Sequence, residues 1–326
     1  MKVSRRDILQ FGAGAAMLPL LREIAEAQTY PTRYVRLVVP FPPGGSADPV
    51  ARVLANRLSE MWGQQVVVEN KGGAGGNLGA QAVATAAPDG YTLLIASGLI
   101  ARNPFLYSSS GYDPVNDLAP VTKICEFTNV MVVPNSSPAK TVKEFIDYAN
   151  ANRGRITFAS SGTGAEPHMS GELFRSLAGL DMTHVPYRGG GPALNDVIPG
   201  RIDVYFGTMP SVLPLIRSGQ LRGLAVTSAK RSPFAPELPT IAEAALPGYG
   251  VSAWYGLFVP AKTPPEIVAT VHDAAAGALA FPAVKQRLAD IAATAVSSTP
   301  AEFKALIRSE MELWGPIIRA ANIKGE

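Results

Sequence analysis

Cysteine and histidine are scarce in this chain of 326 residues, which contains one cysteine, Cys125, and three histidines. A single cysteine cannot form a disulfide within the chain, so packing has to stabilise the fold. His168, His184 and His272 lie far apart, and no H-E-x-x-H motif or paired-cysteine spacing is present. The sequence therefore predicts neither a metal site nor a bound cofactor.

Motifs of catalysis and nucleotide binding are also missing. The chain has no G-x-S-x-G nucleophile elbow and no P-loop. The stretch GGAGGNLG fails the dinucleotide pattern G-x-G-x-x-G, because a pattern that starts at Gly73 needs glycine where Leu78 stands. An S-x-x-K match from Ser137 to Lys140 contains a proline and lacks its companion motifs. We therefore do not expect an enzyme.

A strong charge of either sign is missing as well. Lys and Arg together number 29, and Asp and Glu together number 26, which gives a formal net charge of +3. Such a balance provides little electrostatic attraction to nucleic acid or to an anionic membrane. We expect neither as a partner.

The N-terminus has the parts of an export signal. Arg5 and Arg6 precede a short apolar stretch over residues 8–21, and the A-E-A at residues 25–27 has the form of a cleavage site. The apolar stretch is shorter than the ~20 residues that span a bilayer. We interpret residues 1–27 as a twin-arginine signal peptide and expect the mature protein in the periplasm. An amphipathic N-terminal helix is the alternative.

Short runs of strand-forming residues alternate with stretches of helix length. YVRLVV precedes a helix expected over residues 47–62, VVVE one over 78–86, ITFAS one over 167–178 and THVPY one over 192–198. TLLIAS, VMVVP, DVYFG and LAVTS are further expected strands, and residues 142–152 a further helix. This alternation predicts an α/β protein with parallel sheets covered by helices on both faces.

Two places interrupt the alternation and suggest lobe boundaries. LAPVTKICEFTNVMVVPNSSPAK holds two strand-like runs without a helix between them, and residues 230–247 are rich in proline and turn residues. WYGLFVP then indicates another strand, followed by three helical stretches. We expect residues 28–130 and 252–326 to form lobe one and residues 131–251 to form lobe two. The ligand would lie between them.

Four glycine-rich loops follow expected strands: PFPPGGSAD, NKGGAGGNLG, ASSGTGAEPH and PYRGGGPA. In open α/β sheets, ligands bind beyond the carboxyl ends of the strands, where unpaired N–H groups at helix starts attract carboxylate or phosphate oxygens. PPGGSAD alone fits a turn with a helix capped by Ser46 or Asp48. Because four such loops converge, we expect Gly44, Gly45 and Ser46 to contact a ligand.

Two histidines and one arginine lie in or near these loops. His168 begins a helix, where it could donate to a ligand oxygen or serve as a surface or supporting residue. His184 lies in an expected strand and is interpreted as a packed residue. Arg188 is a cation inside the glycine-rich loop PYRGGGPA, and either a bidentate bond to a carboxylate or a solvent-facing or interlobe role fits it.

Three aromatic residues and one aspartate have two interpretations each. Phe41, Tyr187 and Trp254 could wall an apolar part of the cleft, or lie in the core. Asp203 ends a turn in GRIDVYF, where a site role and a capping role are both open, the capping role being slightly favoured.

Six motifs of this chain resemble, in their order, those of the substrate-binding receptors of tripartite tricarboxylate transporters, also called Bug-type receptors. They are VPFPPGGSAD, VVVENKGGAGGNLGA, APDGYTLL, ASSGTGAEPHMSGELF, HVPYRGGGPAL and KRSPFAPELPTIAEA. The resemblance covers essentially the whole mature chain. Gly73 stands where proline is usual and Ala245 where glycine is usual, and neither change should affect an anion site. The resemblance implies a type II periplasmic binding-protein fold, with two α/β lobes joined by two crossing strands.

The resemblance also implies a site in which both lobes hold one carboxylate, largely through backbone N–H groups, hydroxyls and bound water. Carried over by position, the ligand-binding residues are Phe41, Gly44, Gly45, Ser46 and Asn77 in lobe one, and Ser161, Gly162, Thr163, Gly164, His168, Tyr187, Gly189, Gly190 and Asp203 in lobe two.

We therefore expect a periplasmic solute-binding receptor, a monomer, that captures a small organic carboxylate and delivers it to the membrane subunits of a tripartite tricarboxylate transporter. A ligand sensor for a signalling partner would share this fold. A twin-arginine-exported enzyme is the third hypothesis. Dicarboxylates, acidic amino acids, citrate and aromatic acids all remain open as ligands.

Overall fold

The computed structural model describes residues 30–43, 46–187 and 189–325. The predicted signal peptide, Gly44, Gly45 and Arg188 lie outside the described residues. Within the described residues, no single helix is long and apolar enough to span a membrane; two consecutive helices, Pro265–Ala280 and Pro282–Asp290, meet that test only as a pair bent by 72°.

The first lobe is built on a mixed sheet with the strand order β2-β1-β3-β9-β4. β1 pairs in parallel with β2 and β3, whereas β9 is antiparallel to both of its neighbours, and β10 pairs with the other edge of β4. The strands are β1 (Val35–Val39), β2 (Val66–Asn70), β3 (Thr92–Ser97), β4 (Leu118–Pro134), β9 (Ser252–Pro260) and β10 (Thr294–Ala295). The helices of this lobe are α2 (Ala47–Trp62), η1 (Ala74–Gly76), α3 (Asn77–Ala84), α4 (Leu99–Leu106), α10 (Pro265–Ala280), α11 (Pro282–Asp290) and α12 (Pro300–Ala320).

The second lobe has the strand order β6-β5-β7-β4, with β8 on the other edge of β4. β5 is parallel to β6 and β7, and β4 is antiparallel to β7 and β8. Its further strands are β5 (Ile156–Ser160), β6 (Met182–Pro186), β7 (Val204–Thr208) and β8 (Leu221–Val226). Its helices are α5 (Val142–Ala151), α6 (Glu166–Ala178), α7 (Gly190–Val197), α8 (Met209–Arg217) and α9 (Ile241–Ala244).

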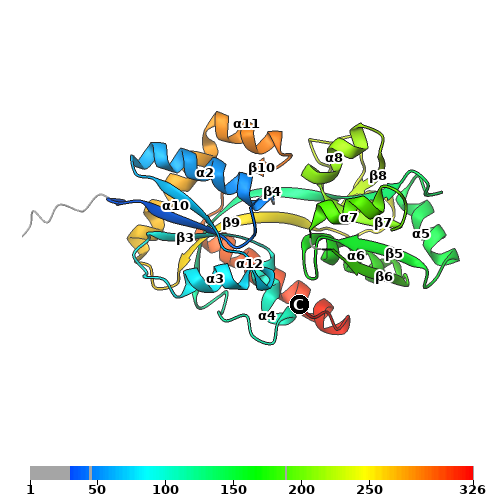
Figure 1. The fold of residues 1–326 in the computed structure, drawn as a ribbon, viewed down its shortest axis with the longest axis horizontal. Helices are drawn as coiled ribbons and strands as arrows, with labels where there is room; N and C mark the ends of the chain where they lie inside the picture. The colour runs from blue at the N-terminus through cyan, green and yellow to red at the C-terminus, as the bar shows by residue number, and fades with distance from the viewer. Residues whose placement is uncertain (1–29, 44–45, 188, 326) are drawn as a thin grey trace, which may run out of the picture.

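Two segments cross between the lobes, as Figure 1 shows. β4 is one strand of 17 residues that pairs with β9 as far as Thr128 and with β7 and β8 from residue 129 onward. The second crossing leads into β9, where the Val251 N–H donates to the Thr227 carbonyl oxygen. The predicted α/β class, with two lobes joined by crossing strands, is confirmed. The two expected strand runs of residues 118–140 form one strand, whose register shifts at two bulges.

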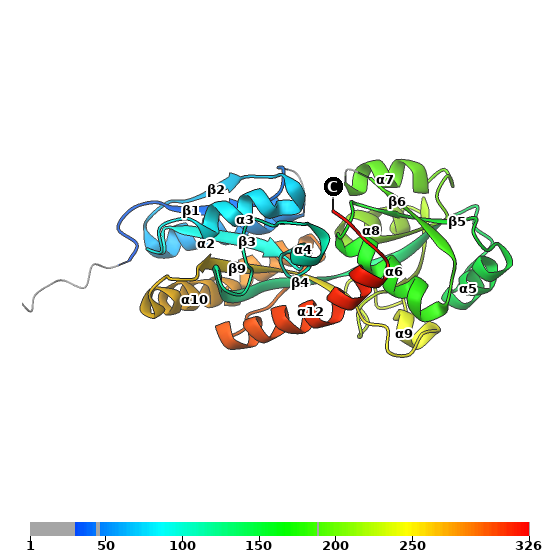
Figure 2. The ribbon, with the colours of Figure 1, turned by 90° about the horizontal axis from the view of Figure 1, so that it is seen from below.

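The lobes also meet away from the crossing strands. Leu106 of α4 and Trp314 of α12 are buried in the same apolar cluster as Phe158 and Phe174 of the second lobe. Figure 2 shows α12 reaching from the first lobe to α6 of the second. The sequence pattern predicted α12 but not α4, because LIARNPFL is short and contains a proline.

Candidate functional site

The carboxyl ends of β1 and β3 form a topological switch point in the first lobe. These strands are neighbours, but β1 leads through α2 to β2 on one side, whereas β3 leads into α4 on the other. Open α/β sheets bind ligands at such a switch point, beyond the carboxyl ends of the two strands. In the second lobe, β5 and β7 diverge in the same way, toward β6 and toward α8. The predicted residues Phe41 and Ser46 follow β1, and Ser161, Gly162, Thr163 and Gly164 follow β5, whereas Asn77 follows β2, and Tyr187, Gly189 and Gly190 follow β6.

The loop after β1 is fastened to its neighbours through Phe41 and Ser46. The Phe41 carbonyl oxygen accepts from Asn70 Nδ2 at 3.1 Å. The Ser46 hydroxyl lies 2.7 Å from the Tyr255 hydroxyl on β9 and makes no capping bond to α2. Burial raises the pKa of Tyr255, so its hydroxyl stays protonated. Ser46 therefore ties the start of α2 to a crossing strand.

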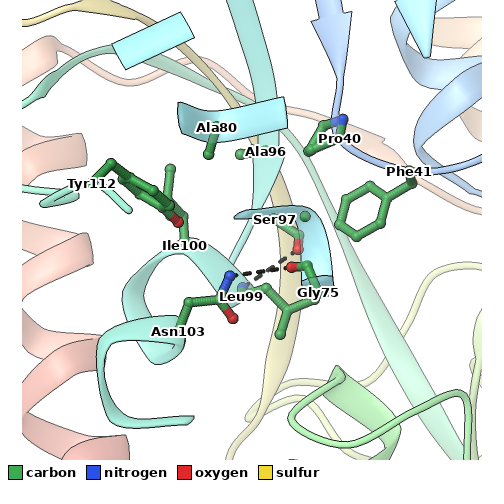
Figure 3. A pocket seen from close by; sticks show the side chains of 11 residues that line it. Pro40, Phe41, Gly75, Ala80, Ala96, Ser97, Leu99, Ile100, Asn103 and Tyr112 are labelled. Carbon is green, nitrogen blue, oxygen red and sulfur yellow. Dashed lines mark hydrogen bonds between the residues drawn. The ribbon is translucent and has the colours of Figure 1, made fainter. Parts of the chain in front are cut away.

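The loop after β2 is held by α4. Asn103 Nδ2 donates to the Gly75 carbonyl oxygen at 3.1 Å and to Asn77 Oδ1 at 2.6 Å. Figure 3 shows Asn103 and Gly75 at a small pocket with Tyr112 and Phe41. The pocket encloses about 10 Å³, room for about one water molecule. Asn77 is buried, and its Nδ2 has no partner among the described residues.

The loop after β5, residues 161–165, is shaped by two glycines with positive φ, Gly162 at 134° and Gly164 at 77°. Their N–H groups are already used, because Gly162 donates to Ser160 Oγ at 3.1 Å and Gly164 to His168 Nδ1 at 3.0 Å. In the described part of the chain, Ser161 and Thr163 have no hydrogen-bond partner for their N–H groups or hydroxyls. These two residues offer donors to an anion.

His168 is on α6, next to this loop, and both of its ring nitrogens have partners there. Since Nδ1 accepts from Gly164, the proton is on Nε2, which lies 3.5 Å from Glu172 Oε1. The residue is 2% exposed. Burial opposes charge on Glu172, but hydrogen bonds from His168 and Arg175 lower the pKa of its carboxyl. His168 thus supports the Gly164 turn, which favours the supporting role among those that the sequence left open.

His184 stacks on His168, with ring centroids 3.6 Å apart and planes at 9°. Its Nε2 lies 2.6 Å from Ser160 Oγ. Burial, followed by the proximity of His168, lowers the pKa of His184 to about 3. The packed, neutral role expected for His184 fits this arrangement.

The loop after β6 is joined to the loop after β5. The Tyr187 N–H donates to the Ser160 carbonyl oxygen at 3.1 Å, and its hydroxyl donates to Asp196 Oδ2 at 2.8 Å. Gly189 has a φ of 119°, and α7 begins at Gly190. The N–H groups of the first turn of α7 have no acceptor within the helix and add to the donors of this lobe.

Asp203 and Trp254 are not brought to these loops. Asp203 Oδ2 accepts from the Thr157 N–H and hydroxyl at 2.8 and 2.9 Å. These residues lie at the amino ends of β5 and β7, one strand length from the carboxyl-end loops. Trp254 is 3% exposed and packs edge-on against Phe303. Asp203 joins two strands, and Trp254 belongs to the core.

Arg102 is the functional residue that sequence reasoning missed. It lies on α4 and is 3% exposed. Its Nη1 donates to the Gly164 carbonyl oxygen at 3.0 Å, and its Nη2 pairs with Glu166 Oε1 at 2.6 Å. Because these partners are more than 60 residues away in sequence, no local pattern could have indicated them.

A larger groove of about 480 Å³ lies over the crossing strands. Its lining includes Phe127 and Ser252 of those strands, residues 228–234 of the second lobe, and Ala292 and Thr294 of the first. None of the predicted site residues that the structure describes lines it. In the described ranges, no three His, Cys, Asp or Glu side chains are placed to hold a metal ion.

Two α/β lobes on crossing strands, with glycine-rich loops at the facing carboxyl ends, define the class of two-lobed solute-binding proteins. The model of the tripartite tricarboxylate transporter family receptor matches residues 50–323. The chain belongs to this family, as the sequence motifs predicted.

Relatives in both sequence and structure agree with this assignment. Protein BugT of Bordetella pertussis is 37% identical over 91% of this chain and 92% of its own length. The structure of R. palustris Rpa4515 with adipate has a TM-score of 0.83 at 38% identity, covering 90% of this chain and 99% of the other. MatC of Rhodopseudomonas palustris with bound malate has a TM-score of 0.77 at 33% identity, covering 89% and 100%.

Proposed function

We propose that this protein captures a small organic carboxylate between its lobes and delivers it to the membrane subunits of a tripartite tricarboxylate transporter. The observation that carries the proposal is the set of donors of Ser161 and Thr163, which have no partner among the described residues and lie beside the start of α7. Donors of this kind suit a carboxylate, because charge-assisted hydrogen bonds to an anion are strong. The adipate and malate held by two similar proteins support a dicarboxylate.

The ligand contacts that we propose are those carried over by position from the family motifs, apart from His168 and Asp203. They are Phe41, Gly44, Gly45, Ser46 and Asn77 from the first lobe and Ser161, Gly162, Thr163, Gly164, Tyr187, Gly189 and Gly190 from the second. His168 supports the Gly164 turn from below. We leave Asp203 out, because its carboxylate joins β5 and β7 at their far ends.

The proposal extends to the organisation of the mature protein. One lobe comprises residues 28–130 and 252–326, and the other comprises residues 131–251. The lobes close over the ligand without any chemical reaction. The protein is a monomer exported by the twin-arginine route to the periplasm, where binding energy is used to bring two half-sites together.

A thermal-shift panel tests the proposal. A ligand that binds only the folded state raises the melting temperature by mass action. We expect a shift with at least one acid among succinate, malate, adipate, citrate, glutamate and benzoate, and no shift with the amide of the same acid. The absence of any shift across mono-, di- and tricarboxylates, amino acids and aromatic acids would contradict carboxylate binding.

A further inference from the structure

Two consecutive residues of α4 reach the two half-sites. Arg102 Nη1 donates to the Gly164 carbonyl oxygen of the second lobe, and Asn103 Nδ2 donates to the Gly75 carbonyl oxygen of the first. The distances are 3.0 and 3.1 Å, and both side chains are almost fully buried, at 3% and 1% exposure. One short helix thus contacts a glycine-rich loop from each lobe.

The Arg102 guanidinium is held in a closed polar environment. Nε donates to the Gly98 carbonyl oxygen at 3.0 Å, and Nη2 pairs with Glu166 at 2.6 Å. A Cβ on Gly98 would lie 2.9 Å from Glu310 Oε2 and closer still to Arg102 Nη2. The glycine therefore leaves room for both side chains. With its donors directed at fixed partners, Arg102 has little freedom to move.

Gly164 is fixed from both lobes. Its N–H donates to His168 within the second lobe, while its carbonyl oxygen accepts from Arg102 of the first. Leu106, one turn after Arg102, fills the space where a Cβ on Gly164 would be. The donors of Ser161 and Thr163 in the same loop are consequently positioned relative to the first lobe.

Asn103 fixes the other loop in the same way. It holds Gly75 and also Asn77, at the start of α3. Consecutive residues on a helix are separated by a rise of ~1.5 Å, so α4 sets the separation of the anchor points on the two loops as long as both hydrogen bonds are made. In this conformation the distance between the half-sites therefore depends on α4.

We propose that Arg102 and Asn103 are positioning residues that set the separation of the loops of residues 72–77 and 161–165, and thereby the length of dicarboxylate that the cleft accepts. This inference rests on the proposed function. Under this proposal, the selectivity for ligand length comes from α4, whose side chains bond to the two loops. Arg102 and Asn103 do not touch the ligand and affect it only through those loops.

Hydrogen exchange on the ligand-free protein tests the positioning itself. Arg102→Met should speed exchange by about tenfold in residues 161–165 and leave residues 72–77 unchanged, since the loop of residues 161–165 loses its hydrogen bond to Arg102. Asn103→Ala should do the reverse. Arg36→Met is the matched control, because the Arg36–Glu69 pair joins β1 to β2 within one lobe. Unchanged exchange in both loops would overturn the proposal, whether or not any acid binds.

Calorimetry with malonate, succinate, glutarate, adipate and pimelate tests the selectivity. Wild type and Arg36→Met should share one preferred length, with at least tenfold selectivity over its neighbours in the series. Arg102→Met should flatten that profile, and Arg102→Lys should restore part of it through its remaining donor. An equal loss of affinity for every acid would overturn the length-setting role. If wild type bound none of these acids, the length-setting role would fail, while the exchange experiment would still decide the positioning and the thermal-shift panel the proposed function.

If Arg102→Met does not fold, Glu166→Gln replaces it. Glutamine keeps an acceptor oxygen for Arg102 but removes the charge, so residues 161–165 should exchange faster by a smaller factor. Exchange identical to wild type in that variant would count against the proposal.

Discussion

Arg102 and Glu166 form a buried ion pair between the two lobes, with Arg102 Nη2 and Glu166 Oε1 2.6 Å apart and side-chain exposures of 3% and 13%. A buried guanidinium needs such a partner, because an unpaired buried charge is costly. The pair lies where α4 meets the start of α6, next to the loop of residues 161–165. The strength of the Arg102–Glu166 pair should therefore affect both the stability of the protein and the position of the loop of residues 161–165.

Removing one member of this pair should destabilise the protein strongly. Arg102→Met leaves Glu166 buried without a partner, and we expect a loss of about 3–5 kcal/mol in the free energy of unfolding. Arg36→Met should cost less than about 1 kcal/mol, because the Arg36–Glu69 pair is largely exposed. Urea denaturation measures both. Similar losses for the two variants would show that the buried pair has no special role.

Gly164→Ala should destabilise the protein through two separate effects. A φ of 77° is unfavourable for alanine, and the new Cβ would collide with Leu106. We expect a loss of about 2–4 kcal/mol, of which the backbone part is about 1–2 kcal/mol. Adding Leu106→Ala should recover part of the steric loss, so the double variant should be more stable than the two separate losses predict. Strict additivity in urea denaturation would contradict the contact.

The stability should fall as the pH is lowered below about 6.5, in part because of His184. Its pKa is about 3 in the folded protein, against ~6.5 in the unfolded chain. Between these values the unfolded state binds a proton that the folded state does not, so the free energy of unfolding falls by up to about 1.4 kcal/mol per pH unit.

His184→Gln should reduce that slope between pH 7 and 4, whatever its stability at pH 7. Denaturation curves at four pH values provide the comparison. Parallel curves for wild type and His184→Gln would show that His184 does not titrate as described.

Export should depend on the two arginines of residues 5 and 6. Replacing both by lysine keeps the charge but removes the twin-arginine pair, so the precursor should accumulate in the cytoplasm of a host with a twin-arginine pathway. Immunoblots of cell fractions measure this, with Lys2→Arg as a control outside the pair. Normal export of the double variant would point to the general secretory route.

The local sequence was sufficient for the fold class and the positions of the glycine-rich loops. The helix expected over residues 47–62 is α2, and the strand ITFAS is β5. Patterns of this kind are local, since periodicity and turn residues act within a few positions. The family motifs then placed Ser161 and Thr163 in a site, and these assignments stay predictions until a ligand is measured.

The tertiary structure decided what no local pattern contains. It assigned His168 to the support of Gly164, Asp203 to the far end of the second sheet and Trp254 to the core. It also revealed α4, whose Arg102 reaches Gly164 across 62 positions of sequence. A hydrogen bond across that separation depends on how two lobes pack, and packing follows from shape and burial over the whole chain. The sequence by itself determined the fold class, most of the strands and helices, and the positions of the glycine-rich loops; only their assembly decided which side chains hold those loops in place.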